Sequence, residues 1–175
     1  NSRAFALYWV VLYLLVLGNL VYYRFLRPLR LLGVQRFKVQ SLRRETGDVL
    51  SICISGRAVQ ALPVLAGQFM IFRFLQRGFL LEAHPFSVSA RPNKKCLRIS
   101  VKNCGGYTGK LVFLQPGTSV LIEGPLGALT ASRCRLAKVL LLAAGIGITP
   151  LRALLEEFIE QHKDCILLYG SRSKA

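Results

Sequence analysis

The chain has 175 residues, a formal net charge of +16 at pH 7 and a mean hydropathy of +0.42. Positive hydropathy together with so large a positive charge is not typical of a single soluble domain. We infer that the chain combines a strongly apolar segment with a basic one, and that these values are averages over both. The five cysteines are odd in number and none are at CxxC spacing, which argues against an iron–sulfur cluster, a zinc site or a disulfide framework. We therefore expect no metal site here, and the free cysteines fit a reducing cytosol.

The first predicted element is an apolar helix over residues 4–26, AFALYWVVLYLLVLGNLVYYRFL. At a rise of about 1.5 Å per residue, a run of this length reaches the roughly 30 Å of a bilayer core. Trp9, Tyr22 and Tyr23 lie near its ends, where interfacial aromatics are common. A buried helix and a signal peptide are the alternatives, but the run is too long for a signal peptide and no small-residue cleavage site follows it. We expect a transmembrane helix.

A basic segment follows this helix, whereas Arg3 is the basic residue on its other side. The segment contains Arg24, Arg27, Arg30, Arg36, Lys38, Arg43 and Arg44. Basic residues near a membrane helix favour the cytoplasmic face and are attracted to anionic lipid. The rest of the chain is therefore predicted to be cytoplasmic. Nucleic-acid binding is the alternative explanation of the charge, but no nucleic-acid motif accompanies it and we expect no such partner.

Residues 35–122 contain short β-type runs separated by turn residues. They are RFKVQSL, DVLSICISG, GQFMIFRFL, PFSVSA, CLRISVK and TSVLIEG. This regular spacing predicts an antiparallel barrel or sandwich, with one helical turn over TGKLVFL after Tyr107. We place the domain boundaries at 1–34 for the helix and its basic segment, 35–130 for the β-barrel and 131–175 for a third segment with a different pattern.

The pattern changes after Gly127. The apolar run LAKVLLLAAG is typical of a buried parallel strand, and it is followed by GIGITP, by the periodic segment LRALLEEFIEQH and by CILLYG. Strand, glycine turn, helix and strand form a βαβ unit, with Thr149 as the expected helix cap and Pro150 in the first turn. One such unit cannot cover both faces of its sheet, so we expect an incomplete α/β parallel-sheet domain.

The turn AAGIGITPL carries the first chemical motif. Gly145 and Gly147 permit close backbone approach, and the helix behind them offers free N–H groups to a phosphate. Pro150 stands where the full dinucleotide fingerprint has a third glycine, so by itself the segment could be a plain strand–helix turn.

Together with the β-domain before it, this loop resembles the GxGxTP loop of the ferredoxin–NADP reductase superfamily, and in particular its membrane branch of ferric reductases and NADPH oxidases. Those proteins join a last membrane helix to a flavin-binding barrel and then to a nicotinamide-nucleotide domain. The resemblance implies the same order here.

The resemblance also assigns roles to the segment HPFS, which looks like the membrane branch's form of the flavin motif Arg-x-Tyr-Ser. Phe86 would pack on the isoalloxazine, and Ser87 would bond the flavin near N5 and is the predicted catalytic residue. His84 would help to hold the flavin phosphate or ribose, and Pro85 would stiffen the segment. The alternative is an ordinary strand with a satisfied core histidine.

Three more segments match family motifs. KNCGGYTGKL is similar to the second flavin motif and contributes Lys102, Gly105, Gly106, Tyr107 and Thr108, with Thr108 expected to cap the turn and contact pyrophosphate. EGPLG, with Gly124, Pro125 and Gly127, is similar to the loop that joins the two domains near the nicotinamide. YGSRS places Arg172 as an NADP contact. A glycine hairpin and bare turns are the alternatives.

The resemblance implies an enzyme that binds FAD and NADPH, or NADH, and passes electrons across a membrane. Haem would be held by upstream helices that are absent from this chain, and the final acceptor would be ferric iron or dioxygen. Two alternatives stay open: a membrane-tethered reductase that serves a ferredoxin, flavodoxin or oxygenase, and a non-catalytic membrane-anchored scaffold. The expected partners are FAD, NAD(P)H, membrane lipid and the electron acceptor.

Overall fold

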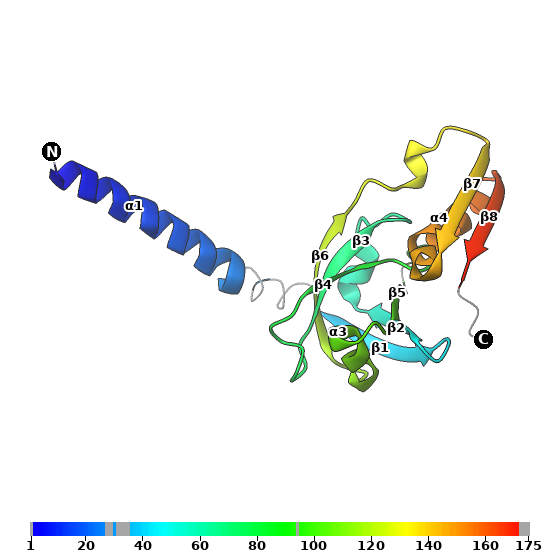
Figure 1. Ribbon diagram of the computed structural model, residues 1–175, viewed down its shortest axis with the longest axis horizontal. Coiled ribbons are helices and arrows are strands. Elements are labelled where there is room, and N and C mark those ends of the chain that lie inside the picture. The colour runs from blue at the N-terminus through cyan, green and yellow to red at the C-terminus, as the bar shows by residue number, and fades with distance from the viewer. Residues whose placement is uncertain (1, 27–29, 31–35, 94, 172–175) are drawn as a thin grey trace. The chain divides into compact units, whose positions relative to one another are not determined.

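The computed structural model describes residues 2–26, 30, 36–93 and 95–171. The chain divides into two compact units, residues 1–35 and 36–175 (Figure 1). The first unit contains helix α1, Ser2–Val21, which continues as a π-helical turn over Tyr22–Leu26. The second contains all the described strands.

Helix α1 is apolar on every side. None of its residues is buried within the structure, and large side chains such as Phe5, Leu14 and Leu15 are exposed around it. A helix that is apolar all round is stable only where its surroundings are also apolar. Among the described residues, Ser2–Leu26 is the one helix with the length and composition to cross a membrane. The prediction of a long apolar helix is confirmed, and Arg27 of the basic segment lies outside the described residues.

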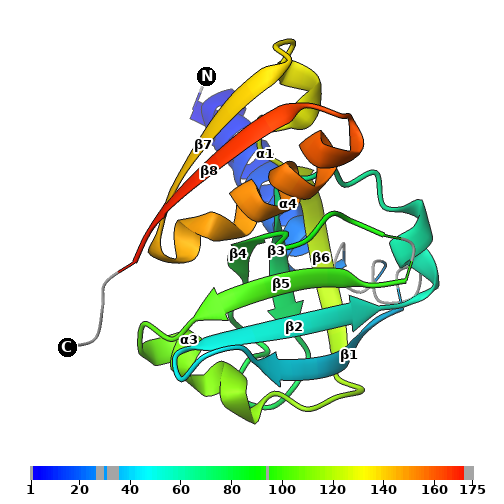
Figure 2. The ribbon, with the colours of Figure 1, turned by 90° about the vertical axis from the view of Figure 1, so that its right-hand side faces the viewer.

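A six-stranded antiparallel sheet forms most of the second unit (Figure 2). Its strands are β1 (Phe37–Arg44), β2 (Val49–Ser55), β3 (Phe69–Phe74), β4 (His84–Ser87), β5 (Leu97–Lys102) and β6 (Ser119–Leu126), in the spatial order β4-β3-β6-β1-β2-β5. The sequence alternation explains the sheet, because every second side chain points to the same face. In β3, Met70, Phe72 and Phe74 are fully buried while the residues between them are half-buried.

The two edge strands of this sheet approach each other just beyond the end of β4. Val88 and Ile99 form an isolated antiparallel bridge, and the Ser89 N–H donates to the Arg98 carbonyl at 2.8 Å. The antiparallel domain was predicted correctly. The predicted closed barrel is not shown, because among the described residues the β4 and β5 ends meet at this bridge and not along a continuous ladder.

Short helical segments connect the strands. They are the 3-10 turns Arg57–Ala61, Leu111–Phe113 and Ala131–Arg133, and the one-turn helix α3, Gly106–Lys110. The helical turn predicted after Tyr107 is therefore present, and it begins at Gly106, one residue before Tyr107.

The last part of the chain is the predicted βαβ unit. Strands β7 (Lys138–Ala144) and β8 (Asp164–Gly170) are parallel and in register, with helix α4 (Ile148–Glu160) between them. Ala153, Leu154 and Phe158 of α4 are buried. The opposite face of the two-stranded sheet leaves Leu140, Leu142, Ile166 and Leu168 exposed.

The predicted helix cap is wrong. The 3-10 turn Gly145–Gly147 leads directly into α4, so Gly147 is the N-cap and Thr149 already lies within the first turn. The Thr149 hydroxyl donates to the Ile146 carbonyl at 3.0 Å, a local side-chain-to-backbone bond that such residues also form inside a helix. Pro150 lies in the first turn, as predicted.

The cysteine prediction also needs correction. The structure joins Cys53 on β2 and Cys96, just before β5, in a disulfide, while Cys104, Cys134 and Cys165 are free. Pairing of β2 with β5 sets the two Cα atoms 5.8 Å apart, within the usual range for a disulfide. The two residues are 43 positions apart in sequence, so spacing alone could not reveal this proximity.

Candidate functional site

The two predicted flavin motifs meet at a pair of rings. The imidazole of His84, at the start of β4, stacks on the ring of Tyr107 in α3, with centroids 3.8 Å apart and planes 28° apart. Nε2 of His84 lies 3.2 Å from a carboxylate oxygen of Glu82. The fold thus brings HPFS and the CGGYT loop into direct contact.

Tyr107 is buried, and its environment is mostly apolar. The Phe79 ring meets it edge-on, with centroids 5.7 Å apart. Burial, and secondarily the charge of Glu82, raises the pKa of Tyr107 to about 12. Its hydroxyl has no hydrogen-bond partner among the described residues. Such a buried, unpaired donor is costly, and a ligand oxygen that accepted from it would remove the cost.

Phe86 packs against the core without being fully enclosed by it. It pairs with Met70 across β3 and β4, and its ring centroid lies 6.1 Å from that of Phe72. The side chain is half-buried rather than enclosed. A half-open aromatic ring on a firm apolar base can receive a flat ligand on its free side.

Ser87 and the EGPLG segment lie at the same end of the sheet. Phe69 of β3 pairs with Ser87 on one side and with Leu126 on the other, so the three strands are in register there. Gly127 packs close to the Phe69 ring, which a Cβ at Gly127 would approach to 3.2 Å. Gly124 and Pro125 lie within β6 rather than in a free interdomain turn, and Pro85 is exposed on β4.

The glycine loop before α3 is held by its own side chains. Asn103 Oδ1 accepts from the Gly105 N–H at 3.0 Å, and the Thr108 hydroxyl accepts from the Cys104 N–H and donates to the Gly105 carbonyl, both at 2.9 Å. Thr108 therefore lies inside the helix and Gly105 is the N-cap, which corrects the predicted cap. Gly105 and Gly106 have positive φ values of 83° and 51°, so glycine is favoured at both.

A cleft of about 1230 Å³ lies between the outer face of β2 and β5 and the βαβ unit. Of the predicted site residues, Lys102, Gly145 and Thr149 line it. Apart from Lys102, the residues of the flavin motifs do not line the cleft. The structure therefore separates the group around the His84–Tyr107 pair, which we call the ring cluster, from the cleft. Arg172 lies outside the described residues.

Sequence reasoning missed a row of hydroxyls along the cleft. Ser51 and Ser100 are 2.7 Å apart across β2 and β5, and Ser100 donates to Ser89 at 2.9 Å. Ser51 and Ser89 are buried. Alternation places Ser51 and Ser100 each on one face of its strand, but only strand pairing shows that the three hydroxyls are neighbours.

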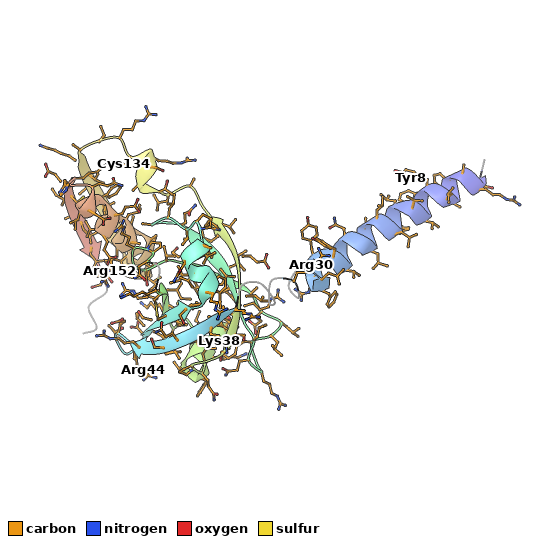
Figure 3. The ribbon with its side chains drawn as sticks, turned by 180° about the vertical axis from the view of Figure 1, so that it is seen from behind. Tyr8, Arg30, Lys38, Arg44, Cys134 and Arg152 are labelled. Atoms are coloured by element: carbon orange, nitrogen blue, oxygen red, sulfur yellow. A yellow bond between two sulfur atoms is a disulfide. The ribbon has the colours of Figure 1, made fainter. Side chains whose placement is uncertain are left out.

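Cations flank the cleft, and most have an acidic partner. Lys102 Nζ lies 3.5 Å from Asp48, and Arg152 on α4 (Figure 3) lies 3.2 Å from Glu156. Arg98 donates to the Ser89 carbonyl at 2.8 Å, while its buried Nε has no partner among the described residues. Burial, and then the nearby Arg152, lowers the pKa of Arg98. The described residues contain no cluster of His, Cys, Asp and Glu suited to a metal.

Comparison with known proteins shows the family to which this chain belongs. Residues 31–130 match the FAD-binding domain family. The chain belongs to this family, which is part of the ferredoxin–NADP reductase superfamily, and respiratory burst oxidase homologues among its relatives support the NADPH oxidase-like branch.

Individual relatives agree with this assignment. A flavohemoprotein of Candida norvegensis is 31% identical over 145 residues, which cover 78% of this chain and 37% of that protein. Respiratory burst oxidase homolog protein D of Solanum tuberosum is 27% identical over 161 residues, covering 81% and 18%. The FAD/NAD-binding domain of a nitric oxide dioxygenase from Vibrio cholerae superposes with a TM-score of 0.69 at 26% identity, covering 79% of this chain and 63% of that one. The chain thus spans about a third of the length of the flavohemoproteins that it matches.

Proposed function

We propose that this chain is the flavin-binding part of a membrane oxidoreductase that takes electrons from NADPH, or NADH, and passes them through FAD to a transmembrane haem. The final acceptor would be ferric iron or dioxygen, with superoxide as the product in the second case. The observation that carries the proposal is the His84–Tyr107 contact, because it unites two flavin motifs of a chain in the FAD-binding family. When bound, FAD supplies the chemistry that accepts a hydride and releases single electrons.

The residues of the ring cluster fit a flavin. Phe86 offers its open side to the isoalloxazine, and Ser87 beside it is the proposed bonding partner near N5. His84 holds phosphate or ribose, and the unpaired Tyr107 hydroxyl can donate to an oxygen of the cofactor. Gly105 and Gly106 leave open space, since a Cβ at either would meet no described atom within 4 Å. These residues would position the cofactor and exclude water, and Ser87 would hold a proton near the reacting atom.

The cleft is proposed to receive the nicotinamide nucleotide. Gly145, Gly147, Thr149 and Pro150 form the turn at the start of α4, and Lys102 lies on the opposite wall. Arg172 remains a predicted contact for the NADPH phosphate. On this proposal residues 35–130 form the flavin domain and residues 131–175 begin the nucleotide-binding domain, with residues 1–34 as the membrane segment.

We further propose that α1 crosses the membrane and that the second unit is cytoplasmic, on the strength of the apolar helix and the basic segment after it. The alternative reductase, serving a soluble acidic carrier, is favoured by the net charge of +16 and by neighbours such as the ferredoxin reductase of carbazole 1,9a-dioxygenase, which shares the fold. A scaffold without flavin is the third possibility.

The test is a titration of the purified 175-residue chain with FAD, monitored by flavin fluorescence and visible absorption. Flavin fluorescence and the visible absorption band should both change on binding, because the isoalloxazine would leave water and stack on the Phe86 ring. In a protein that includes the whole nucleotide-binding domain, NADPH should reduce the bound flavin under anaerobic conditions and bleach its visible absorption. If the 175-residue chain stays colourless and leaves flavin fluorescence unchanged, both reductase proposals are excluded and the scaffold is favoured.

A further inference from the structure

Two exposed turns of the second unit form an apolar patch outside the ring cluster and the cleft. The patch consists of Leu80 and Leu81 in the turn after β3 and of Val112 and Phe113 in the 3-10 turn after α3. Leu81 is 80% exposed and Phe113 is 72% exposed. Isolated exposed apolar residues are ordinary, but four in two adjoining turns indicate a contact surface. We call this group the Leu81 patch.

The two turns are held together by the side chain of Gln76, which bonds to the backbone of the second turn. Gln76 donates from Nε2 to the Phe113 carbonyl and accepts from the Gln115 N–H, both at 3.0 Å. Below the surface, Phe79 of the first turn is 3% exposed and packs edge-on against Tyr107 of α3. The apolar tips are therefore presented by a fixed base, so their exposure does not depend on a loosely attached loop.

Two cations lie beside the patch in sequence. Arg77 lies in the same turn as Leu81, and Lys110 immediately precedes the turn that carries Phe113; both are exposed. Glu82, the acidic residue of the first turn, is directed to His84 at 3.2 Å. Apolar tips flanked by cations are complementary to the boundary between anionic headgroups and acyl chains.

We propose that the Leu81 patch is a membrane contact: its four apolar side chains enter the interfacial region of an anionic leaflet while Arg77 and Lys110 bind lipid phosphates. The inference rests on the proposed membrane crossing of the apolar helix Ser2–Leu26, which would tether this unit to a bilayer, a large apolar and anionic surface. The contact is independent of FAD and would orient the flavin domain at the membrane.

The test places a tryptophan in the patch. The full chain is reconstituted into lipid nanodiscs of phosphatidylcholine and phosphatidylserine, with Trp9, the single native tryptophan, replaced by phenylalanine. In this background the Leu81→Trp variant is compared in discs with and without brominated acyl chains, which quench tryptophan on contact. We expect its emission to fall by about twofold in brominated discs, as for an interfacial side chain.

The control is Leu136→Trp, because Leu136 is 71% exposed and also has basic neighbours, Arg133 and Arg135. Its segment, residues 131–137, lies at the end of the second unit opposite α3 in both ribbon views (Figures 1 and 2). Emission from Leu136→Trp should be the same in both kinds of disc. Equal quenching at both positions would overturn the proposal, since contact would then not be specific to the patch.

Two further outcomes decide the partner. A blue-shifted Leu81→Trp emission without bromine quenching would mean that protein covers the patch, and would overturn the lipid assignment. Removing Arg77 and Lys110 by a double alanine variant should reduce the quenching in discs that contain phosphatidylserine, whereas the matched Arg133→Ala/Arg135→Ala variant should not. Equal effects of the two double variants would reduce the contact to general charge attraction and overturn the proposed site.

Discussion

The imidazole of His84 lies flat on the ring of Tyr107, 3.8 Å away, although the two residues belong to different elements and are far apart along the chain. This stack joins β4 to α3, the two segments that we propose hold the flavin. It also buries the Tyr107 hydroxyl beside a histidine and a glutamate without giving it a partner among the described residues.

Tyr107→Phe should change how the stability of the FAD-free protein depends on pH. The pKa of Tyr107 is raised from 10.0 in its ordinary state to about 12 in the fold, so above pH 10 the unfolded chain loses this proton first. The folded state is therefore favoured by this group below pH 10, and that contribution is lost between pH 10 and 12. Urea unfolding should show a smaller loss over this range for Tyr107→Phe than for the wild type; equal losses would contradict the assignment.

At neutral pH the same variant should be as stable as the wild type or more stable by about 1 kcal/mol, because an unpaired buried hydroxyl is removed. FAD affinity is measured separately on the same variant. A weaker FAD affinity at unchanged stability would show that the Tyr107 hydroxyl bonds to the cofactor.

Phe86→Ala should weaken FAD binding while leaving the fold largely intact. Its ring is half-buried, whereas Phe72 behind it is fully buried, so Phe72→Ala would cost about 3–5 kcal/mol of folding stability and obscure any effect on the flavin. Phe113→Ala, at an exposed position, is the better control. Fluorescence titration should give at least about a tenfold weaker FAD affinity for Phe86→Ala, as expected from losing roughly 1.4 kcal/mol of stacking. An unchanged affinity would remove Phe86 from the flavin site.

Gly67→Ala should loosen the packing of α4 on the sheet. Gly67 has φ 86°, and an added Cβ would meet the Leu129 carbonyl and lie 2.9 Å from the Leu154 side chain. Gly117 has nearly the same φ, 87°, but its Cβ would meet no described atom within 4 Å. Gly117→Ala should thus cost about 1 kcal/mol for backbone strain alone, and Gly67→Ala about 3 kcal/mol or more. If chemical denaturation gives similar losses of unfolding free energy for the two variants, the close approach of Gly67 to Leu129 and Leu154 is not important for stability.

Thiol alkylation should distinguish the cysteines. In protein purified without reductant, alkylation followed by peptide mass analysis should label Cys104, Cys134 and Cys165 but not Cys53 or Cys96. Reduction should expose all five, and the lost cross-link should lower stability by about 2–4 kcal/mol. Labelling of Cys53 before reduction would show that the pair is a dithiol and would contradict the disulfide.

Much of the fold follows from the sequence because it depends on local periodicity. Alternation in residues 49–55 predicted β2, and the continuous apolar run before Gly145 predicted the parallel strand β7. The long apolar run predicted α1 directly. The candidate motifs were also readable locally, since each is a short run that contains glycine, proline or hydroxyl residues, either within a strand or next to one. Helix starts were less certain: Thr108 and Thr149 both lie inside their helices, because a glycine takes the cap position in each case.

Features that depend on pairing between distant strands could not be predicted in this way. The hydroxyl row Ser51–Ser100–Ser89, the Cys53–Cys96 disulfide and the His84–Tyr107 stack all join residues whose separation along the chain says nothing of their distance. Local backbone preference and hydrophobic periodicity act over a few residues, so the sequence by itself determined the kinds of element and their order. Which side chains become neighbours is decided by strand register and by the packing of α4 and α3 on the sheet, and only the tertiary structure contains that information.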